Sequence, residues 1–119
     1  MLVDTSVWVD HFRRGDPALS TLLLREQVHS HLFIIGELAC GSLRRRSELL
    51  SLLQSLPTVP VSSDNEALGF IERHRLMRWG IGWIDVHLLA SASLAGIPLW
   101  TRDRRLSEVA RSLDLSAQP

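Results

Sequence analysis

Short, largely apolar stretches alternate along the chain with longer segments in which apolar residues recur at helical spacing. Stretches of this kind, bounded by turn-forming residues or by helix starts, predict β-strands. We expect a final edge strand to start at Leu115. The four main strands are expected at Leu2–Val3, Val28–Leu32, Thr58–Val61 and Ile97–Thr101.

Apolar residues three or four positions apart predict helices between and after these strands. Thr5–Ser6 and Ser62–Ser63 are typical helix caps, and Pro17 is typical of a first helical position. Gly96 is typical of a helix C-terminus, and a turn is expected at 80–82. The helices are expected at residues 5–12, 17–26, 34–43, 47–56, 64–79, 85–95 and 106–113.

Alternation of strands and helices is typical of an α/β domain with a mainly parallel sheet and helices on both faces. A chain of 119 residues has the size of one ordinary domain, and its 45% apolar content is enough for a core. The sequence has no internal repeat, low-complexity segment or linker, so residues 1–119 are expected to form a single domain.

Composition excludes several kinds of chemistry. The formal net charge is zero, so no global basic field attracts nucleic acid, and all thirteen basic residues are arginine, which excludes any reaction that needs a lysine. The single cysteine, Cys40, excludes an internal disulfide and a cysteine-rich zinc site, and we expect it to be a buried structural thiol. No apolar run reaches membrane-spanning length and no signal peptide is apparent, so a soluble cytoplasmic protein is expected.

Four acidic residues stand out because their neighbours are apolar or because they lie at the ends of elements. Asp4 ends the first strand, Asp103 follows the strand at 97–101, Asp85 starts a helix, and Glu37 interrupts the apolar segment FIIGELACG. In an open parallel sheet the ligand site lies beyond the carboxyl ends of the strands, where the strand order reverses. Acids brought together there repel one another unless a cation neutralises them, and hard oxygen ligands favour Mg²⁺ or Mn²⁺.

Each acid also has a simpler explanation. Asp4 fits an Asx turn or a helix cap, Asp85 fits an N-cap, Asp103 fits turn chemistry or pairing with nearby arginines, and Glu37 fits a solvated helix edge. A metal site would suit hydrolysis of a phosphodiester, whose oxygens bridge to the ion.

Four segments in the expected order carry a resemblance to a known family. They are LVDTSVWVD at the N-terminus, GELACG in mid-chain, GIGWIDVHLLASA and LWTRDRRL. Together they resemble a PIN-domain ribonuclease, and most closely the VapC-type toxin of a type II toxin–antitoxin pair. The resemblance spans nearly the whole chain and implies a PIN-like three-layer sandwich.

The resemblance implies a Mg²⁺- or Mn²⁺-dependent endoribonuclease that acts as a toxin and inhibits translation. It matches the family's acidic residues to Asp4, Glu37, Asp85 and Asp103, with Asp4 and Asp85 as the most direct metal ligands. Small hydroxyl residues beside the acids match Ser6 and Thr101. The implied partners are a VapB-like antitoxin that blocks the site, the RNA substrate and a second copy of the chain in a homodimer.

Other polar and aromatic residues give weaker signals. Arg102, Arg104 and Arg105 flank an expected site residue and favour contact with RNA or a partner, whereas Arg13–Arg14 fits a solvated surface better. The run Arg44–Arg46 fits either role. Trp83 adjoins the expected site and is a candidate for the same contacts.

The histidines are given structural roles. His87 lies two residues after Asp85 and would point away from it on a helix, so a structural role is favoured. His29 and His31 would share one face of a strand, but the sequence suggests no third ligand for a zinc site.

Two alternatives remain open. A receiver domain of a signalling pathway has a similar length and an acid cluster with Mg²⁺, but it needs a lysine and paired acids after the first strand, and this chain has neither. A PIN-like binding module without catalysis is the second alternative, although all four acids are present.

Overall fold

A parallel sheet lies at the centre of the molecule, and the computed structural model describes all of residues 1–119. Its strands are β1 (Leu2–Val3), β2 (Ser30–His31), β3 (Thr58–Val59) and β4 (Leu99–Trp100). β1 pairs with β4, β2 pairs with β3, and a parallel bridge between Leu2 and His29 joins the two pairs. The strand order is therefore β3-β2-β1-β4.

The C-terminal segment extends the sheet by one short edge. Leu99 donates a backbone hydrogen bond to the Leu115 carbonyl at 2.7 Å, and Ala117 donates one to the Leu99 carbonyl at 3.0 Å. These bonds form a parallel bridge between Leu99 and Ser116. The edge strand that was expected at Leu115 is therefore confirmed, in a minimal form.

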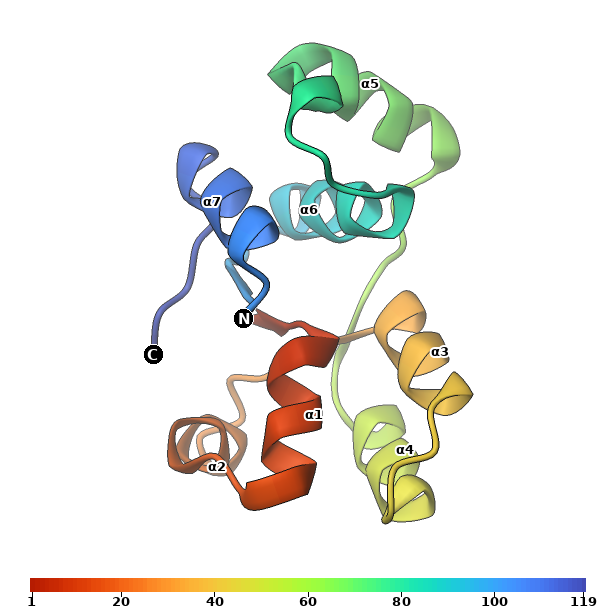
Figure 1. Ribbon diagram of the computed structural model, residues 1–119, viewed down its shortest axis with the longest axis vertical. Coiled ribbons are helices and arrows are strands. Elements are labelled where there is room, and N and C mark those ends of the chain that lie inside the picture. The colour runs from red at the N-terminus through yellow and green to blue at the C-terminus, as the bar shows by residue number, and fades with distance from the viewer.

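Helices cover both faces of the sheet, which confirms the expected α/β sandwich. In Figure 1, α1 to α4 lie below the strands and α5 to α7 lie above them. None of these helices combines the length and the apolar composition needed to cross a membrane. The helices are α1 (Thr5–Arg14), α2 (Pro17–Leu24), α3 (Leu32–Cys40), α4 (Arg46–Ser55), α5 (Asp64–His74), α6 (Trp83–Ala95) and α7 (Arg104–Ser112), with a 3₁₀ turn, η1, at Leu76–Arg78.

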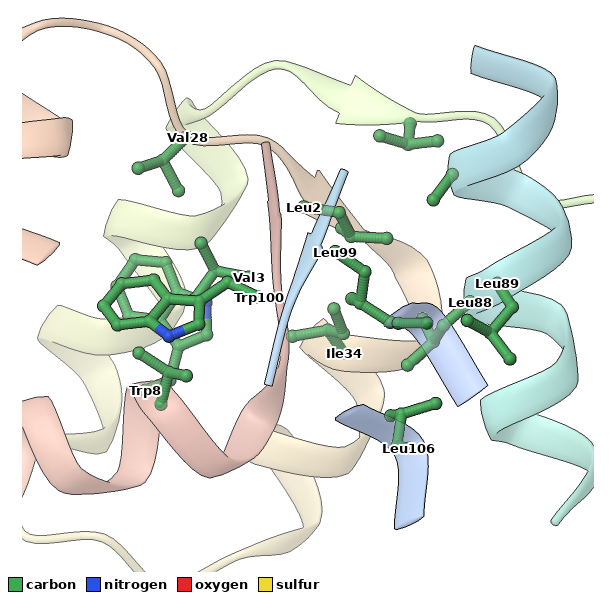
Figure 2. Close-up of a cluster of buried hydrophobic side chains, with 14 of the residues drawn as sticks. Leu2, Val3, Trp8, Val28, Ile34, Leu88, Leu89, Leu99, Trp100 and Leu106 are labelled. Carbon is green, nitrogen blue, oxygen red and sulfur yellow. The ribbon is translucent and has the colours of Figure 1, made fainter. Parts of the chain in front are cut away.

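Alternation along the strands divides the core between the two faces. Leu2 and Leu99 point toward Leu88 and Leu89 of α6, whereas Val3 and Trp100 point toward Trp8 of α1, as Figure 2 shows. Leu2 and Trp8 are fully buried. Because successive strand residues face opposite sides, two residues per strand are enough to anchor a helical layer on each face.

Two predicted boundaries around α3 are wrong by a few residues. The strand expected at 28–32 ends at His31, because this residue serves as the N-cap of α3 and its Nδ1 accepts a hydrogen bond from Phe33 N at 3.0 Å. The helix ends at Cys40 rather than Leu43. Cys40 is exposed, contrary to expectation, because α3 buries the face of Ile34 and Leu38.

The segment expected as one helix over 64–79 is divided. Ser63 and Glu66 form a capping box at its start, as the early acidic residues suggested. The helix ends at His74 because Arg75 adopts a left-handed conformation with φ 54° and ψ 50°. This turn directs Leu76 into the core, where it is 3% exposed.

Arg102 connects three elements just after β4. Its guanidinium bonds to Asp10 on α1 at 2.8 Å and to Asp16, the N-cap of α2. It also lies 5.3 Å from the centroid of the Trp100 ring. The hydrogen bond from Arg102 holds the pKa of Asp16 below its usual value, although burial opposes this effect. Arg102 therefore fixes the loop after β4 against α1 and α2.

Replacing Arg102 by alanine is expected to lower the free energy of unfolding by about 1–3 kcal/mol, because the buried Asp16 carboxylate loses its ionic partner. Urea denaturation measures the loss. Arg104→Ala is the matched control, since Arg104 pairs only with Glu108 at 3.4 Å on an exposed surface. The control should change stability by no more than about 0.5 kcal/mol. Equal losses in the two variants would contradict the assigned role of Arg102.

Candidate active site

The strand order reverses beside β1, so the carboxyl ends of β1 and β4 lie at the point of reversal. The chain passes from β1 to β2 on one side and returns from β3 to β4 on the other side of β1. Such a reversal of strand order is where α/β sheets bind their ligands. Asp4 directly follows β1, and Thr101 to Asp103 directly follow β4. Both segments thus lie at the reversal of strand order where they were expected from the sequence, and their role as the site stays a prediction.

The side chain of Asp4 does not serve as a helix cap, although the residue occupies the N-cap position of α1. Its backbone carbonyl accepts a hydrogen bond from Val7 N at 3.1 Å, but its carboxylate accepts none from the backbone N–H groups of the helix. The Asp4 side chain is instead buried, and its Oδ2 accepts hydrogen bonds from Ser6 Oγ at 2.9 Å and Thr101 Oγ1 at 2.8 Å. Capping therefore does not explain this carboxylate.

Backbone groups orient both hydroxyls toward Asp4. Ser6 Oγ accepts a hydrogen bond from Arg102 N at 3.0 Å, and Thr101 Oγ1 accepts one from Asp103 N at 3.1 Å. Each hydroxyl accepts from the backbone and donates to the carboxylate. The Oδ2 atom of Asp4 is thus held on two sides, while Oδ1 has only a long contact of 3.4 Å with Thr5 Oγ1. This arrangement leaves one carboxylate oxygen available to a ligand.

Asp85 lies in the first turn of α6 but is not its cap. The helix begins at Trp83 with Gly82 as N-cap, two residues earlier than expected, and no side chain caps it. The Asp85 side chain is half-buried. Burial raises the pKa of its carboxyl, and the negative charges of Asp4 and Asp103 raise it further. The positive end of the helix dipole is the natural place for such a charge.

Glu37 projects from α3 at the mouth of the site. The residue is largely exposed, yet partial burial of its carboxyl raises its pKa, and the charges of Asp4 and Asp85 add to this effect. A carboxylate on a solvated helix edge would not feel these charges. Glu37 therefore belongs to the same electrostatic cluster as the two aspartates.

Asp103 combines a structural role with its place beside the site. Its Oδ1 accepts a hydrogen bond from Leu106 N at 2.9 Å and caps α7, as the turn interpretation expected. Its charge nevertheless raises the pKa of Asp85. Asp85 thus lies within electrostatic reach of Asp4, Glu37 and Asp103, which come from three other parts of the fold.

The donor chemistry of this cluster fits a divalent cation. In the present geometry no three His, Cys, Asp or Glu side chains meet closely enough to form a complete metal-binding set. The oriented carboxylate of Asp4 and the raised pKa values of Glu37 and Asp85 nevertheless mark a site where negative charge is crowded. Hard oxygen ligands of this type suit Mg²⁺ or Mn²⁺, and a cation would relieve the repulsion.

The arginines and the tryptophan expected at the site differ in how freely they can reach a partner. Arg102 is engaged with Asp10 and Asp16, as described above. Arg104 lies 3.4 Å from Glu108, and Arg105 makes a long contact of 3.5 Å with the Gly80 carbonyl. Trp83 is 41% exposed. Contact of these four residues with RNA or a partner stays a prediction.

A buried polar network beneath the site was not foreseen. His31 Nε2 bonds with Ser91 Oγ at 3.1 Å, and Ser91 Oγ also accepts from Ser62 N at 3.0 Å. Ser62 Oγ bonds with His87 Nδ1 at 2.8 Å. His87 thus has the structural role assigned to it from the sequence. The signal that could have found this network is the pair His87 and Ser91, four positions apart on an otherwise apolar helix.

The network joins the elements that carry two of the acids. His31 begins α3, which carries Glu37, and both His87 and Ser91 lie on α6, which carries Asp85. His31 is fully buried, and burial lowers its pKa to about 4, with the nearby His87 adding to the effect. His29 lies apart from it, with Nδ1 3.2 Å from the amino group of Met1.

The profile of the PIN domain family matches residues 1–112. The chain belongs to the PIN domain family. It is 44% identical over 107 residues to Ribonuclease VapC32 of Mycobacterium tuberculosis, in both strain CDC 1551 and strain H37Rv, covering 89% of this chain and 86% of that protein. The resemblance of the four sequence segments to VapC-type PIN domains is therefore confirmed.

A solved structure supports the PIN domain fold. The crystal structure of PAE2754 from Pyrobaculum aerophilum superposes with a TM-score of 0.64 at 18% identity, covering 94% of this chain and 84% of that chain. The receiver-domain alternative is wrong, because doubly wound folds of that type have the strand order 2-1-3-4-5, whereas β2 here lies between β1 and β3.

Acidification from pH 6.5 to pH 4 is expected to lower the free energy of unfolding of this PIN domain by about 3 kcal/mol through His31. The unfolded chain binds a proton at His31 near pH 6.5, whereas the folded chain binds it only near pH 4. Between these values the unfolded state holds more protons, so falling pH favours unfolding. Urea denaturation across this interval measures the effect.

His31→Gln is the control for this prediction. The raised pKa values of Glu37 and Asp85 act in the opposite direction, but they contribute equally to both proteins. The variant is expected to be less stable at pH 7 and to lose less stability on acidification. The same pH dependence in both proteins would show that His31 titrates normally.

Proposed function

We propose that this PIN domain is a metal-dependent endoribonuclease that acts as the toxin of a type II toxin–antitoxin pair and inhibits translation. The observation that carries the proposal is the buried Asp4 carboxylate, which is oriented by the hydroxyls of Ser6 and Thr101 and does not cap the backbone of α1. The identity of 44% with a protein named Ribonuclease VapC32 supports RNA as the substrate.

The proposed metal is Mg²⁺ or Mn²⁺. Asp4 and Asp85 would be its direct ligands, and Glu37 and Asp103 would complete the pocket directly or through water. When bound, such an ion polarises the phosphoryl oxygen, lowers the pKa of an attacking water and stabilises the leaving oxygen. The crowding of negative charge that raises the pKa values of Asp85 and Glu37 supports this assignment.

The residues of the chain contribute orientation and charge. Ser6 and Thr101 fix the Asp4 carboxylate through Oδ2, which leaves Oδ1 with only the long contact to Thr5 Oγ1. Glu37 lies at the open side, where it is suited to accept a proton from a water molecule beside the scissile phosphate. Its raised pKa brings it closer to neutral pH, which favours such a transfer.

The proposed partners follow from the same family relationship. We infer a cognate VapB-like antitoxin that covers the acids, and a homodimer. An exposed apolar surface supports a protein interface. Leu32 is 58% exposed and lines a shallow groove together with Phe33, Gly36, Glu37, Cys40 and Ile84. Trp83, the chain neighbour of Ile84, is 41% exposed.

Asp4→Asn and Asp85→Asn are each expected to weaken Mn²⁺ binding at least about tenfold, because each removes a charged metal ligand. RNA cleavage should fall on the order of a hundredfold or more, since the ion supplies several kcal/mol of transition-state stabilisation. Calorimetry with Mn²⁺ and a gel assay on cellular RNA measure the two effects.

Asp114→Asn is the matched control, because Asp114 is exposed in the turn after α7 and asparagine tolerates its positive φ of 56°. The control should bind metal and cleave RNA like the parent. Parent-like cleavage by both Asp4→Asn and Asp85→Asn would disprove the site assignment. Metal binding without cleavage of any RNA by the parent would identify a PIN-like binding module instead.

A further inference from the structure

An open groove leads away from Glu37 between α1 and the segment that connects α3 to α4. Its inner part, about 370 Å³, is lined by residues that include Thr5, Arg13, Glu37 and Ser42. Its outer part, about 610 Å³, is also lined by Arg13 and Ser42 and ends at Arg44 and Arg45. The two cavities adjoin, since Arg13, Ser42 and Leu43 line both, and together they are here called the arginine groove.

The arginine groove carries positive charge that the protein does not neutralise. Arg13 and Arg44 are exposed and make neither an ion pair nor a side-chain hydrogen bond anywhere in the chain. Arg45 pairs with Glu48 at 3.5 Å, but both side chains are about 70% exposed, so this pair is weak. By contrast, the neighbouring Arg14 is paired with Asp10.

The two ends of the arginine groove carry charges of opposite sign. Negative charge is gathered at the inner end, where Glu37 adjoins the acids, and unpaired guanidinium groups stand at the outer end. When an RNA-like polyanion places one phosphate at the acids, its other phosphates are repelled by them. Cations farther along the groove would therefore stabilise its binding. Arginine binds phosphate through two parallel hydrogen bonds, which suits a nucleic acid backbone.

We infer that the arginine groove holds the RNA strand beside the scissile phosphate, with Arg13 and Arg44 as its phosphate contacts. The inference rests on the proposed ribonuclease activity and adds the path of the substrate. Phe12 lines the outer part of the groove and offers an aromatic wall for a base. The sequence favoured a solvated surface for Arg13. Arg13 is exposed, and it also lines both parts of this groove.

The test compares two double variants that remove the same charge. Arg13→Ala/Arg44→Ala removes the two groove cations. Arg73→Ala/Arg78→Ala removes two exposed arginines of α5 and η1, which lie in the other helical layer. Binding of a fluorescein-labelled single-stranded RNA of mixed sequence is measured in an Asp85→Asn background, so that the probe is not cleaved. Each dissociation constant is determined over a series of salt concentrations.

The groove variant is expected to bind the RNA about tenfold more weakly or worse, and its salt slope should fall by about 1.4, since each single-strand phosphate contact contributes about 0.7. The control variant should differ from its parent by no more than about twofold. With Asp85 restored, the groove variant should raise KM for RNA cleavage and leave kcat unchanged. Arg13→Lys/Arg44→Lys should restore the salt slope.

The outcomes separate this inference from the proposed function. Equal changes of the RNA dissociation constant and of KM in the groove and control variants would overturn the inference. The ribonuclease proposal would remain intact. Absence of RNA binding and cleavage in the parent would overturn both. An aspartate-rich peptide that binds the parent through Arg13 and Arg44, without any change in RNA binding by the groove variant, would assign the groove to a protein partner.

Discussion

The hydrogen bond that Thr101 donates to Asp4 joins residues 97 positions apart, at the same carboxylate oxygen that accepts from Ser6. The bond from Thr101 can form only because β1 and β4 pair in parallel, with Val3 opposite Trp100. The same pairing places Arg102 N against Ser6 Oγ and Asp103 N against Thr101 Oγ1. Once this junction is made, two short side chains orient Asp4, and backbone N–H groups hold both of their hydroxyls in place.

The acids around this junction oppose the stability of the fold. Burial and mutual repulsion raise the pKa values of Glu37 and Asp85, so their ionised forms are less favourable in the folded chain than in the unfolded chain. The opposite holds for Asp16, whose pKa is lowered by Arg102. The pKa shifts of Glu37 and Asp85 are therefore opposite in direction to that of Asp16, whose ion pair stabilises the structure.

Sequence reasoning predicted the alternation of elements and the places where Asp4 and Asp103 would meet, because strand pairing and the reversal of strand order follow from general rules. It could not place the exact boundaries. His31 ends a strand and caps a helix at once, and Arg75 turns left-handed so that Leu76 can be buried. Both choices are made by tertiary packing, which local patterns do not contain.

Other features were hidden for a different reason. Cys40 follows apolar residues and was expected inside, but the face that α3 buries is decided by its contacts with the rest of the core. The network of His31, Ser62, His87 and Ser91 joins three elements, so no single segment reveals it. Whether a guanidinium group of the arginine groove is free or paired likewise depends on which carboxylates lie near it in space.

The short bridge made by the C-terminal segment has a consequence for the behaviour of the molecule in concentrated solution. β4 has β1 on one side, and on the other its backbone groups are occupied by Leu115 and Ala117. Without that cover, the amide and carbonyl of Leu99 would form a bare strand edge, which is a template for pairing with another chain. The bridge thus covers the β4 edge of the sheet against pairing with another chain and leaves β3 as its only edge strand without such a cover.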